Sequence, residues 1–278
     1  MSDRAHVEIS HAEILRAETL THRFPDGKEG LAGVDLAVHE GEFLLLAGRN
    51  GSGKTLLVRH FVGLSTPSSG RVLYRGRPVG ECLREVRRAV GFVFQDTESQ
   101  ILGQTVAEDL AFGPANLRLD RREISFRVDE SLAIARLEGM KDRRPETLSG
   151  GEKRRLAVAA VLAMRPECLI LDEPFANLDL ESVRDILRLF ADLKTAGKTL
   201  IILTHELEKT VHLADRLAIM DKGRIVYDGK PDDPDPGLYL PHGLADPYAQ
   251  ALWSSLVPAA GSSPPPESSP APASGDAR

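Results

Sequence analysis

The chain of 278 residues is long enough for one or two domains with a substantial core, which excludes a peptide or a disulfide-stabilised mini-protein. Its 35 Lys and Arg residues against 41 Asp and Glu give a net charge of −6, so nucleic acid is not an expected partner. With 42% hydrophobic and 27% charged residues, the composition is that of an ordinary soluble protein.

The cysteines and the apolar runs limit the compartment. Cys82 and Cys168 stand far apart without C-x-x-C spacing, which predicts neither a disulfide framework nor a zinc site and favours a reducing cytosol. The longest apolar run, 156–164, is about half the length of a membrane-spanning helix. The first residues carry no signal-peptide pattern. We therefore expect any work at a membrane to be done through partners.

Two hydrophobic patterns alternate along the chain. The segment 12–77 has turn residues and period-two alternation, which predict antiparallel strands. Short apolar runs predict buried strands at 42–47, 168–171 and 199–203, and the amphipathic stretch 181–195 predicts a helix. Residues 96–165 are expected to be mainly helical and inserted between core strands. This alternation predicts the α/β class, with a mostly parallel sheet covered by helices.

The sequence changes character after Lys230. Five prolines fall between 231 and 247, which predicts an irregular extension over 231–257. From 258 to 278 the chain is nearly all Pro, Ser, Ala and Gly, which predicts a disordered tail. The folded domain is thus expected to span 1–230.

The segment 48–55 reads GRNGSGKT and fits the phosphate-binding pattern G-x-x-x-x-G-K-[ST] without a mismatch. It lies between a predicted strand and a predicted helix over 56–63, where backbone N–H groups at a helix N-terminus can surround phosphate oxygens. Lys54 would neutralise the β- and γ-phosphates, and Thr55 would ligate Mg²⁺. The predicted nucleotide-binding residues of this loop are Gly48, Asn50, Gly51, Ser52, Gly53, Lys54 and Thr55.

Two carboxylates follow the apolar run 168–171. Asp172 would hold the hydration shell of Mg²⁺, and Glu173 would orient and polarise an attacking water. Acidic residues at strand ends are also common turn formers, so the pair gains its meaning from the phosphate-binding loop.

The segment 148–152 reads LSGGE and opens a predicted helix over 153–164. Alone it is a plausible helix cap, with Ser149 capping and Glu152 three residues on. In order with the phosphate-binding loop, Asp172–Glu173 and Thr204–His205, however, it makes the chain resemble the ATP-binding-cassette (ABC) ATPase family over about 12–230. The resemblance implies ATP hydrolysis and a RecA-like P-loop NTPase fold, with an antiparallel β subdomain and an α-helical subdomain at about 96–165.

The resemblance also implies roles for single residues. Phe24 is similar to the aromatic that stacks on adenine, and Gln95 to the glutamine that touches Mg²⁺ and the attacking water while sensing the membrane partner. His205 is similar to the histidine that holds the γ-phosphate. A lone Phe, Gln or His would ordinarily be a core or solvated residue, so these roles depend on order and spacing. The implied catalytic residues are Lys54, Gln95, Glu173 and His205, and the implied metal ligands are Thr55, Gln95 and Asp172.

Part of the implied site belongs to a second subunit. In the family, residues matching Ser149, Gly150 and Gly151 bind the γ-phosphate of ATP held by the opposite subunit, and Asp179 matches a loop that crosses the dimer interface. The expected partner is a second ABC ATPase subunit, as a homodimer or a related heterodimer, with ATP and Mg²⁺ as cofactors.

Two positions depart from the family pattern. Leu56 follows Thr55 where most members carry a second hydroxyl residue, so one contact to the α-phosphate is missing and nucleotide affinity is expected to be slightly lower. Leu180 stands where proline is frequent, and its consequence is not evident from the sequence.

The branch of the family is indicated by 93–102 and 105–114, which read VFQDTESQIL and TVAEDLAFGP. They resemble the ATPases of energy-coupling-factor importers and of cobalt and nickel transport. That resemblance implies a membrane scaffold protein and a small substrate-binding membrane protein as partners, a vitamin or transition-metal ion as cargo, and a place at the cytoplasmic face of the membrane. No histidine cluster distinguishes a metal from a vitamin.

The alternative is a soluble ABC ATPase that acts on DNA or ribosomes. It is disfavoured because each motif occurs once and no heptad run appears. A scaffold that does not hydrolyse ATP is disfavoured because Glu173 and His205 are both present.

We also expect acidic residues beside Gln95 to form a rim that receives a basic helix of the scaffold. The residues of this predicted rim are Asp96, Glu98, Glu108 and Asp109. A solvated acidic face is the equal alternative.

Overall fold

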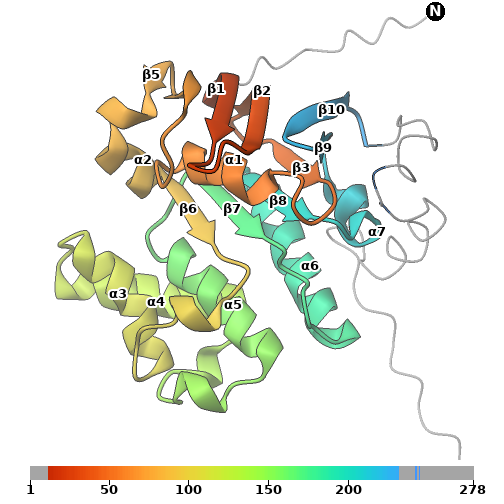
Figure 1. Cartoon of the computed structure of the whole chain (residues 1–278). Helices are drawn as coiled ribbons and strands as arrows, with labels where there is room; N and C mark the ends of the chain where they lie inside the picture. The colour runs from red at the N-terminus through yellow and green to blue at the C-terminus, as the bar shows by residue number, and fades with distance from the viewer. Residues whose placement is uncertain (1–11, 232–241, 243, 245–278) are drawn as a thin grey trace, which may run out of the picture.

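The computed structural model describes residues 12–231, 242 and 244, shown in colour in Figure 1. The predicted irregular extension over 231–257, except residues 231, 242 and 244, and the predicted disordered tail over 258–278 lie outside the described residues. Within the described part, no helix is both long enough and apolar enough to cross a membrane. Cys82 and Cys168 are buried free thiols.

A six-stranded sheet forms the centre, in the order β10-β9-β3-β8-β7-β6. All neighbours pair in parallel except β10, which is antiparallel to β9. The strands are β3 (Phe43–Ala47), β6 (Val90–Val93), β7 (Cys168–Asp172), β8 (Thr199–Thr204), β9 (Arg216–Asp221) and β10 (Arg224–Gly229). The mostly parallel sheet predicted from the short apolar runs is therefore confirmed.

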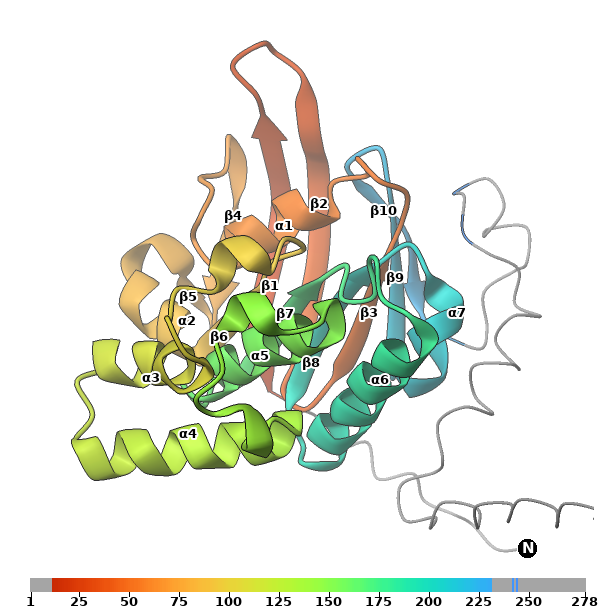
Figure 2. The ribbon, with the colours of Figure 1, turned by 90° about the horizontal axis from the view of Figure 1, so that it is seen from below.

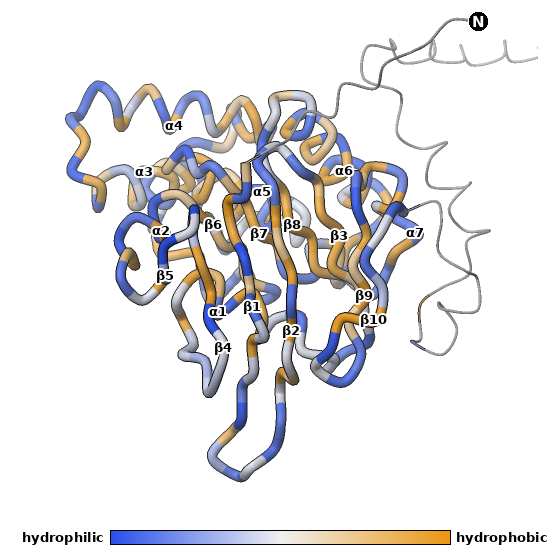
Figure 3. The backbone as a smooth tube through the Cα atoms, turned by 90° about the horizontal axis from the view of Figure 1, so that it is seen from above, coloured by the Kyte–Doolittle hydropathy of each residue, from blue (hydrophilic) through white to orange (hydrophobic). Residues whose placement is uncertain are grey.

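The apolar runs form central strands because both of their faces are buried. Every residue of β3 is buried, with Leu44 and Leu46 in one core and Phe43 and Leu45 in another. Figure 3 shows the same pattern as mostly hydrophobic colour along β3. The central sheet thus separates two hydrophobic cores.

The first core lies under a four-stranded antiparallel sheet in the order β2-β1-β4-β5. Its strands are β1 (Glu13–Arg23), β2 (Glu29–His39), β4 (Ser69–Tyr74) and β5 (Arg77–Pro78). Helices α1 (Lys54–Phe61) and α2 (Leu83–Ala89) and the short helix η1 (Val79–Glu81) complete this layer. The antiparallel strands predicted within 12–77 are confirmed, and Figure 2 shows the β1–β2 hairpin projecting beyond the rest of the sheet.

Helices cover the opposite face of the central sheet. They are α5 (Gly150–Leu162), α6 (Leu180–Thr195), α7 (Leu207–Thr210) and the short helix η5 (Val211–Leu213). Phe190 of α6 packs edge-on against Phe43 of β3, with ring centroids 6.4 Å apart. The amphipathic stretch predicted at 181–195 is therefore the helix that buries its apolar face here.

The chain between β6 and β7 is mainly helical, as the sequence predicts for 96–165. It contains η2 (Glu98–Gln100), α3 (Val106–Asn116), α4 (Arg121–Ala135), η3 (Glu138–Met140), η4 (Pro145–Thr147) and α5. Leu110, Leu132 and Leu156 belong to a third core between α3, α4 and α5. Figure 1 shows these three helices grouped to one side of the strands.

The sheet order brings three segments together at one edge. Ala47 at the end of β3 pairs with Thr204 at the end of β8, and Asp172 at the end of β7 pairs with Leu203. The segments that follow these strands therefore meet at the carboxyl edge of the sheet, where open α/β sheets bind ligands.

Candidate functional site

The loop after β3 requires glycine at two positions. Gly48 has φ 147°, and a β-carbon there would lie 2.3 Å from the carbonyl oxygen of Met220. Gly53 has φ 110°, and a β-carbon there would lie 3.0 Å from the carbonyl oxygen of Gly30. Gly53 is also the N-cap of α1 and provides no side-chain hydrogen bond, so the first-turn N–H groups face outward without a side-chain cap. Such a helix N-terminus is suited to an anion.

The side chain of Lys54 is held by backbone groups of this loop. Its side chain is 5% exposed, and Nζ donates to the carbonyl oxygens of Gly48 at 2.6 Å and Arg49 at 3.4 Å. Nζ also lies 3.4 Å from Oε1 of Glu173. The ammonium is thus held in the loop next to the carboxylate that follows β7.

Thr55 and Asp172 form the second contact between the loop and β7. Thr55 Oγ1 donates to Asp172 Oδ2 at 2.7 Å. Burial raises the pKa of Asp172, while the hydrogen bond from Thr55 opposes that shift. A hydroxyl and a carboxylate at this distance fit Mg²⁺, which is usually bound by one or two carboxylates together with substrate phosphates.

Glu173 occupies a strained backbone position. Its φ is 47°, and its N–H donates to the carbonyl oxygen of Leu203 at 2.9 Å, which anchors it to β8. Oε2 lies 3.0 Å from Nδ1 of His205, whereas Oε1 has no hydrogen-bond partner among the described residues. Oε1, which lies in the 3.4 Å ion pair with Lys54 Nζ, can still accept a hydrogen bond from a water molecule.

These groups open into a pocket of about 700 Å³. Asn50, Gly51, Ser52, Gly53, Lys54 and Thr55 line one part of it, together with Asp172 and Glu173. Phe24, at the tip of the β1–β2 hairpin, lines another part and is 41% exposed. Leu56 and Gln95 also line it. Most of the predicted nucleotide-binding residues are therefore brought to one cavity.

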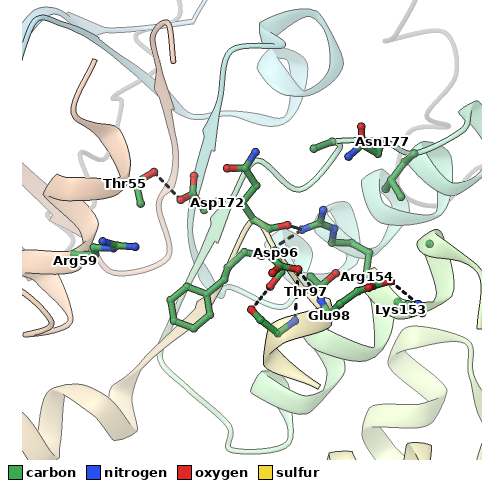
Figure 4. A pocket seen from close by; sticks show the side chains of 15 residues that line it. Thr55, Arg59, Asp96, Thr97, Glu98, Lys153, Arg154, Asp172 and Asn177 are labelled. Carbon is green, nitrogen blue, oxygen red and sulfur yellow. Dashed lines mark hydrogen bonds and ion pairs between the residues drawn. The ribbon is translucent and has the colours of Figure 1, made fainter. Parts of the chain in front are cut away.

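Gln95 also lines a second pocket of about 640 Å³, shown in Figure 4. Thr55 and Asp172 lie on one side of this pocket, and Lys153 and Arg154 of α5 lie on the other. Thr55, Arg59, Gln95 and Asp172 line both pockets, so the cavity beside the phosphate-binding loop adjoins the cavity beside the helical segment at these residues.

Arg154 is a site residue that the sequence did not identify. It is 5% exposed, and its Nη1 donates to the carbonyl oxygens of Gln95 at 3.0 Å and Phe94 at 3.3 Å. Burial lowers the pKa of this guanidinium, and Asp96 and Asp172 offset that effect. Arg154 is the middle one of three consecutive basic residues, and nothing in the local sequence marks it as the buried one.

The predicted acidic rim is wrong at Asp109. This side chain is 4% exposed, and its Oδ1 accepts from the N–H groups of Leu102 at 2.7 Å and Gly103 at 3.0 Å. Asp109 instead stabilises the turn before α3, because its carboxylate satisfies two backbone donors. Asp96 and Glu98 do line the second pocket, where Glu98 pairs with Lys153 at 2.5 Å. Glu108 is exposed and accepts from the N–H of Gln104.

The segment at the start of α5 is built as a complete cap. Ser149 accepts from the N–H of Glu152, and Glu152 accepts from the N–H of Ser149. A β-carbon at Gly151 would lie 2.1 Å from Ser182 Oγ, so this glycine permits the close approach of α5 and α6. Asp179 caps α6 by accepting from the N–H of Ser182 at 2.8 Å. Gly150 lines the second pocket.

Of the described residues that line the 700 Å³ pocket, none belongs to 149–151, and Asp179 is not one of them. The structure therefore brings Lys54, Thr55, Asp172, Glu173 and His205 together, with Gln95 and Phe24 at the same cavity. It does not bring the segment 149–151 or Asp179 to that cavity within one chain.

Comparison with known proteins identifies the family. A model of the ABC transporter family matches residues 31–176. A putative ABC transporter ATP-binding protein of Methanosarcina mazei is 45% identical, over 81% of this chain and 83% of its own length. The chain belongs to the ABC transporter ATPase family.

Other similar proteins are more specifically named. The cobalt import ATP-binding protein CbiO of Rhodobacter capsulatus is 45% identical over 78% of each chain. The energy-coupling factor transporter ATP-binding protein EcfA of Methanocaldococcus jannaschii is 42% identical, over 79% of this ABC ATPase and 80% of its own length.

Solved structures agree with this family. CbiO1 of Clostridium perfringens, described as part of the ABC transporter complex CbiONQ, has a TM-score of 0.74 at 37% identity and covers 79% of this chain and 89% of its own. A nucleotide-free ATP-binding cassette from an ABC transporter has a TM-score of 0.69 at 26% identity and covers 78% and 91%. The predicted fold and the predicted ABC-type ATP hydrolase activity are thereby confirmed, and the protein binds nucleotide.

Proposed function

We propose that this ABC ATPase energises a membrane importer of the energy-coupling-factor type, with a vitamin or a transition-metal ion such as cobalt or nickel as cargo. The importer branch is supported by the relatives named for cobalt import and for the energy-coupling factor. The observation that carries the hydrolytic part is the meeting of Thr55–Asp172 with Lys54–Glu173–His205 at one sheet edge.

The residues of this edge divide the reaction among them. Lys54 and the outward N–H groups of α1 bind the phosphates, and Thr55 and Asp172 hold Mg²⁺. When bound, Mg²⁺ neutralises charge on the phosphate oxygens. Glu173 orients the attacking water through Oε1, which accepts no hydrogen bond from the described residues, and His205 holds Glu173 in place while contacting the γ-phosphate. Gln95, which lines both pockets, would contact Mg²⁺ and the attacking water.

The remaining predicted residues contact the base of the nucleotide or lie at the interface with a second subunit. Phe24 stacks on the adenine, and Ser149, Gly150 and Gly151 bind the γ-phosphate of a second subunit's ATP. This division between subunits is supported because the segment 149–151 lies away from the pocket of its own chain. Asp179 lies in the loop at the same interface.

Dimer formation is tested by sedimentation equilibrium of Glu173→Gln with ATP and Mg²⁺. An ATP-dependent dimer supports a homodimer, because the variant retains the γ-phosphate that joins the two copies. A species that stays monomeric at saturating ATP contradicts the homodimer and leaves a related second ATPase as the partner.

The expected membrane partners are a scaffold protein and a small substrate-binding protein, with the ABC ATPase peripheral at the cytoplasmic face. The 640 Å³ pocket, which Gln95 lines together with Asp96 and Glu98, is the proposed contact for the scaffold. A partner bound there would lie next to the reacting phosphates. Affinity purification of the tagged chain from its own cell's detergent-solubilised membranes tests this. Recovery of both membrane proteins supports the importer, whereas recovery of only soluble proteins, DNA or ribosomes overturns it.

Charge reversal tests which part of the surface receives the scaffold. Asp96→Lys with Glu98→Lys is expected to reduce recovery of the scaffold, because both carboxylates line the shared pocket. Glu138→Lys with Asp142→Lys is the matched control, since these exposed residues lie on the helical segment and do not line that pocket. Equal recovery by the two double variants contradicts the acidic contact.

A further inference from the structure

Two histidines connect the β1–β2 hairpin with helix α1 behind the nucleotide pocket. Nδ1 of His22 on β1 lies 3.1 Å from Nε2 of His60 on α1, although 38 positions separate them in sequence. Nδ1 of His60 lies 2.7 Å from the carbonyl oxygen of Leu56. His60 is 1% exposed, so this contact is shielded from solvent at its inner end.

The direction of these hydrogen bonds follows from the chemistry of the groups. A carbonyl oxygen only accepts, so Nδ1 of His60 carries its hydrogen and donates to Leu56. Nε2 of a neutral His60 then accepts, which requires Nδ1 of His22 to donate. Burial lowers the pKa of His60, against the smaller raising effects of backbone hydrogen bonds with Leu56 and Thr66, and so favours this neutral form. The bonds therefore run in one direction, from His22 through His60 to the backbone of α1.

The outer end of this chain contacts Phe24. The rings of His22 and Phe24 meet edge-on, with centroids 5.0 Å apart and planes at 72°. On another side of Phe24, a β-carbon at Gly30 would lie 2.7 Å from Phe24 Cε2 and 2.5 Å from Leu56 Cδ2. Phe24 is thus packed by His22 and Gly30, while it remains 41% exposed and lines the pocket.

We propose that His22 and His60 are positioning residues that fix the Phe24 ring in the orientation in which it stacks on the nucleotide base. This inference rests on the proposed role of Phe24. An aromatic side chain at a hairpin tip loses rotational freedom when a base binds, and a ring that is already fixed loses less. The histidine pair couples that orientation to α1, the helix that begins at the phosphate-binding loop.

Binding of ATP compared with inorganic tripolyphosphate tests the proposal, because only ATP carries a base. By isothermal titration, Phe24→Ala is expected to weaken ATP about tenfold, within the range typical of base stacking on an aromatic ring. His22→Ala is expected to weaken ATP about threefold to fivefold by loosening the same ring. Neither change should alter tripolyphosphate affinity. His39→Ala is the control, because His39 lies at the far end of β2 and contacts Glu42.

A double variant separates positioning from a general effect on the structure. In the Phe24→Ala background, His22→Ala should cause no further loss of ATP affinity, because the ring through which it acts is gone. His22→Asn retains an N–H donor toward His60 and should recover part of the lost affinity. The proposal is overturned if the fold-losses of ATP affinity of the two single variants multiply in the double variant. It is also overturned if His22→Ala weakens tripolyphosphate as much as ATP.

Two further measurements distinguish failure of this proposal from failure of the proposed function. Imidazole ¹⁵N NMR of the wild-type protein should show that His60 carries its hydrogen on Nδ1. A hydrogen on Nε2 would contradict the proposed hydrogen-bond direction, and this test does not depend on whether His22→Ala folds. Unchanged ATP affinity in Phe24→Ala contradicts the adenine-stacking role of Phe24, and absence of ATP binding by the wild type contradicts the nucleotide site as a whole. Neither result would come from an error about the histidine pair alone.

Discussion

Helices α1 and α5 both begin at glycine-rich segments, yet their N-termini are completed differently. Helix α1 starts after Gly53, which provides no side-chain cap. Helix α5 starts after Ser149, where Ser149 and Glu152 satisfy each other's backbone N–H groups. The first helix therefore has N-terminal N–H groups without a side-chain cap, as the proposed phosphate site requires, whereas the second is capped within its own chain.

The polar side chains around the two helices differ in the same way. Near α1, Ser52 Oγ and Glu173 Oε1 are buried without a hydrogen-bond partner among the described residues, and burial raises the pKa of Asp172. At the N-terminus of α6, which packs against α5, the hydrogen bond from Ser182 lowers the pKa of Asp179. Within α5 itself, Arg154 Nε is also buried without a hydrogen-bond partner among the described residues, so the contrast holds for the starts of the helices. Within the described residues, the nucleotide pocket thus contains polar atoms without hydrogen-bond partners, which phosphate, Mg²⁺ or water could contact. Segment 149–152 at the start of α5 satisfies its own backbone groups, and its contact with a phosphate of a second subunit stays a prediction.

The largest effect on ATP turnover is expected from Glu173→Gln, in the nucleotide pocket. The amide keeps the shape of the side chain but cannot polarise water, so turnover should fall by about 10²- to 10⁴-fold. ATP binding should persist, since Lys54 and the N–H groups of α1 are unchanged. Phosphate release and ATP titration measure the two quantities, with the exposed Glu138→Gln as control. Substantial hydrolysis by purified Glu173→Gln contradicts the assignment.

Thr55→Val tests whether the Thr55–Asp172 contact is the Mg²⁺ site. Removing the hydroxyl should raise the Mg²⁺ concentration needed for half-maximal hydrolysis by about tenfold to a hundredfold. Thr195→Val is a matched control, because the hydroxyl of Thr195 donates to the carbonyl oxygen of Ala191 at the end of α6, away from the pocket residues. An unchanged Mg²⁺ dependence in Thr55→Val would remove Thr55 from the metal site.

The two shifted carboxylates predict opposite pH effects on stability in the absence of ligands. The pKa of Asp172 is raised in the folded state, so this group costs stability as pH rises from its ordinary value of 3.8 through the raised one. Asp172→Asn should therefore be more stable than wild type at neutral pH, with the gain vanishing near pH 3.8. The pKa of Asp179 is lowered, so its contribution is present above 3.8 and is lost as pH falls through the lowered value.

Asp179→Asn is accordingly expected to lose stability at neutral pH and to match wild type at low pH. Urea unfolding of the three proteins across pH measures both trends. A gain in both variants, or a loss in both, contradicts the contrast between the pocket side and the α5 side. The size of each change also reports how far each carboxylate is screened by water.

Local sequence predicted the groups that lie beside regular elements. The glycines and Lys54 follow one buried strand in a recognisable phosphate-binding pattern, and Asp172–Glu173 follow a second buried strand. These groups lie close together because β3, β8 and β7 are neighbours in a parallel sheet. The roles assigned to these residues remain predictions. Gln100 lies in the segment 93–102 that indicated the branch of the family, and the structure adds a role that the sequence did not predict. Its side chain accepts from Phe94 N–H and donates to the Phe92 carbonyl oxygen, which fixes the segment that carries Gln95.

The sequence did not reveal groups whose surroundings come from distant segments. Arg154 looks like its basic neighbours until α5 packs against the segment after β6. Asp109 looks like a surface acid until the turn before α3 folds over it. His22 and His60 lie on different elements, and no periodicity connects them. Burial and pairing of polar groups depend on tertiary packing, which hydrophobic patterning alone does not encode.

The smallest effect is expected at the capped helix, and it separates folding from function. Ser149→Ala removes the cap of α5 and should lower the unfolding free energy by about 1 kcal/mol. Asp120→Ala removes the cap of α4, where Asp120 accepts from the N–H groups of Arg122 and Glu123, and should cost about the same. Only Ser149→Ala should also weaken ATP-dependent dimerisation and turnover, because only Ser149 is proposed to meet a second subunit's phosphate. If both variants lose stability and neither loses turnover, Ser149 is a helix cap and no more, and the difference between α1 and α5 would then reflect folding alone.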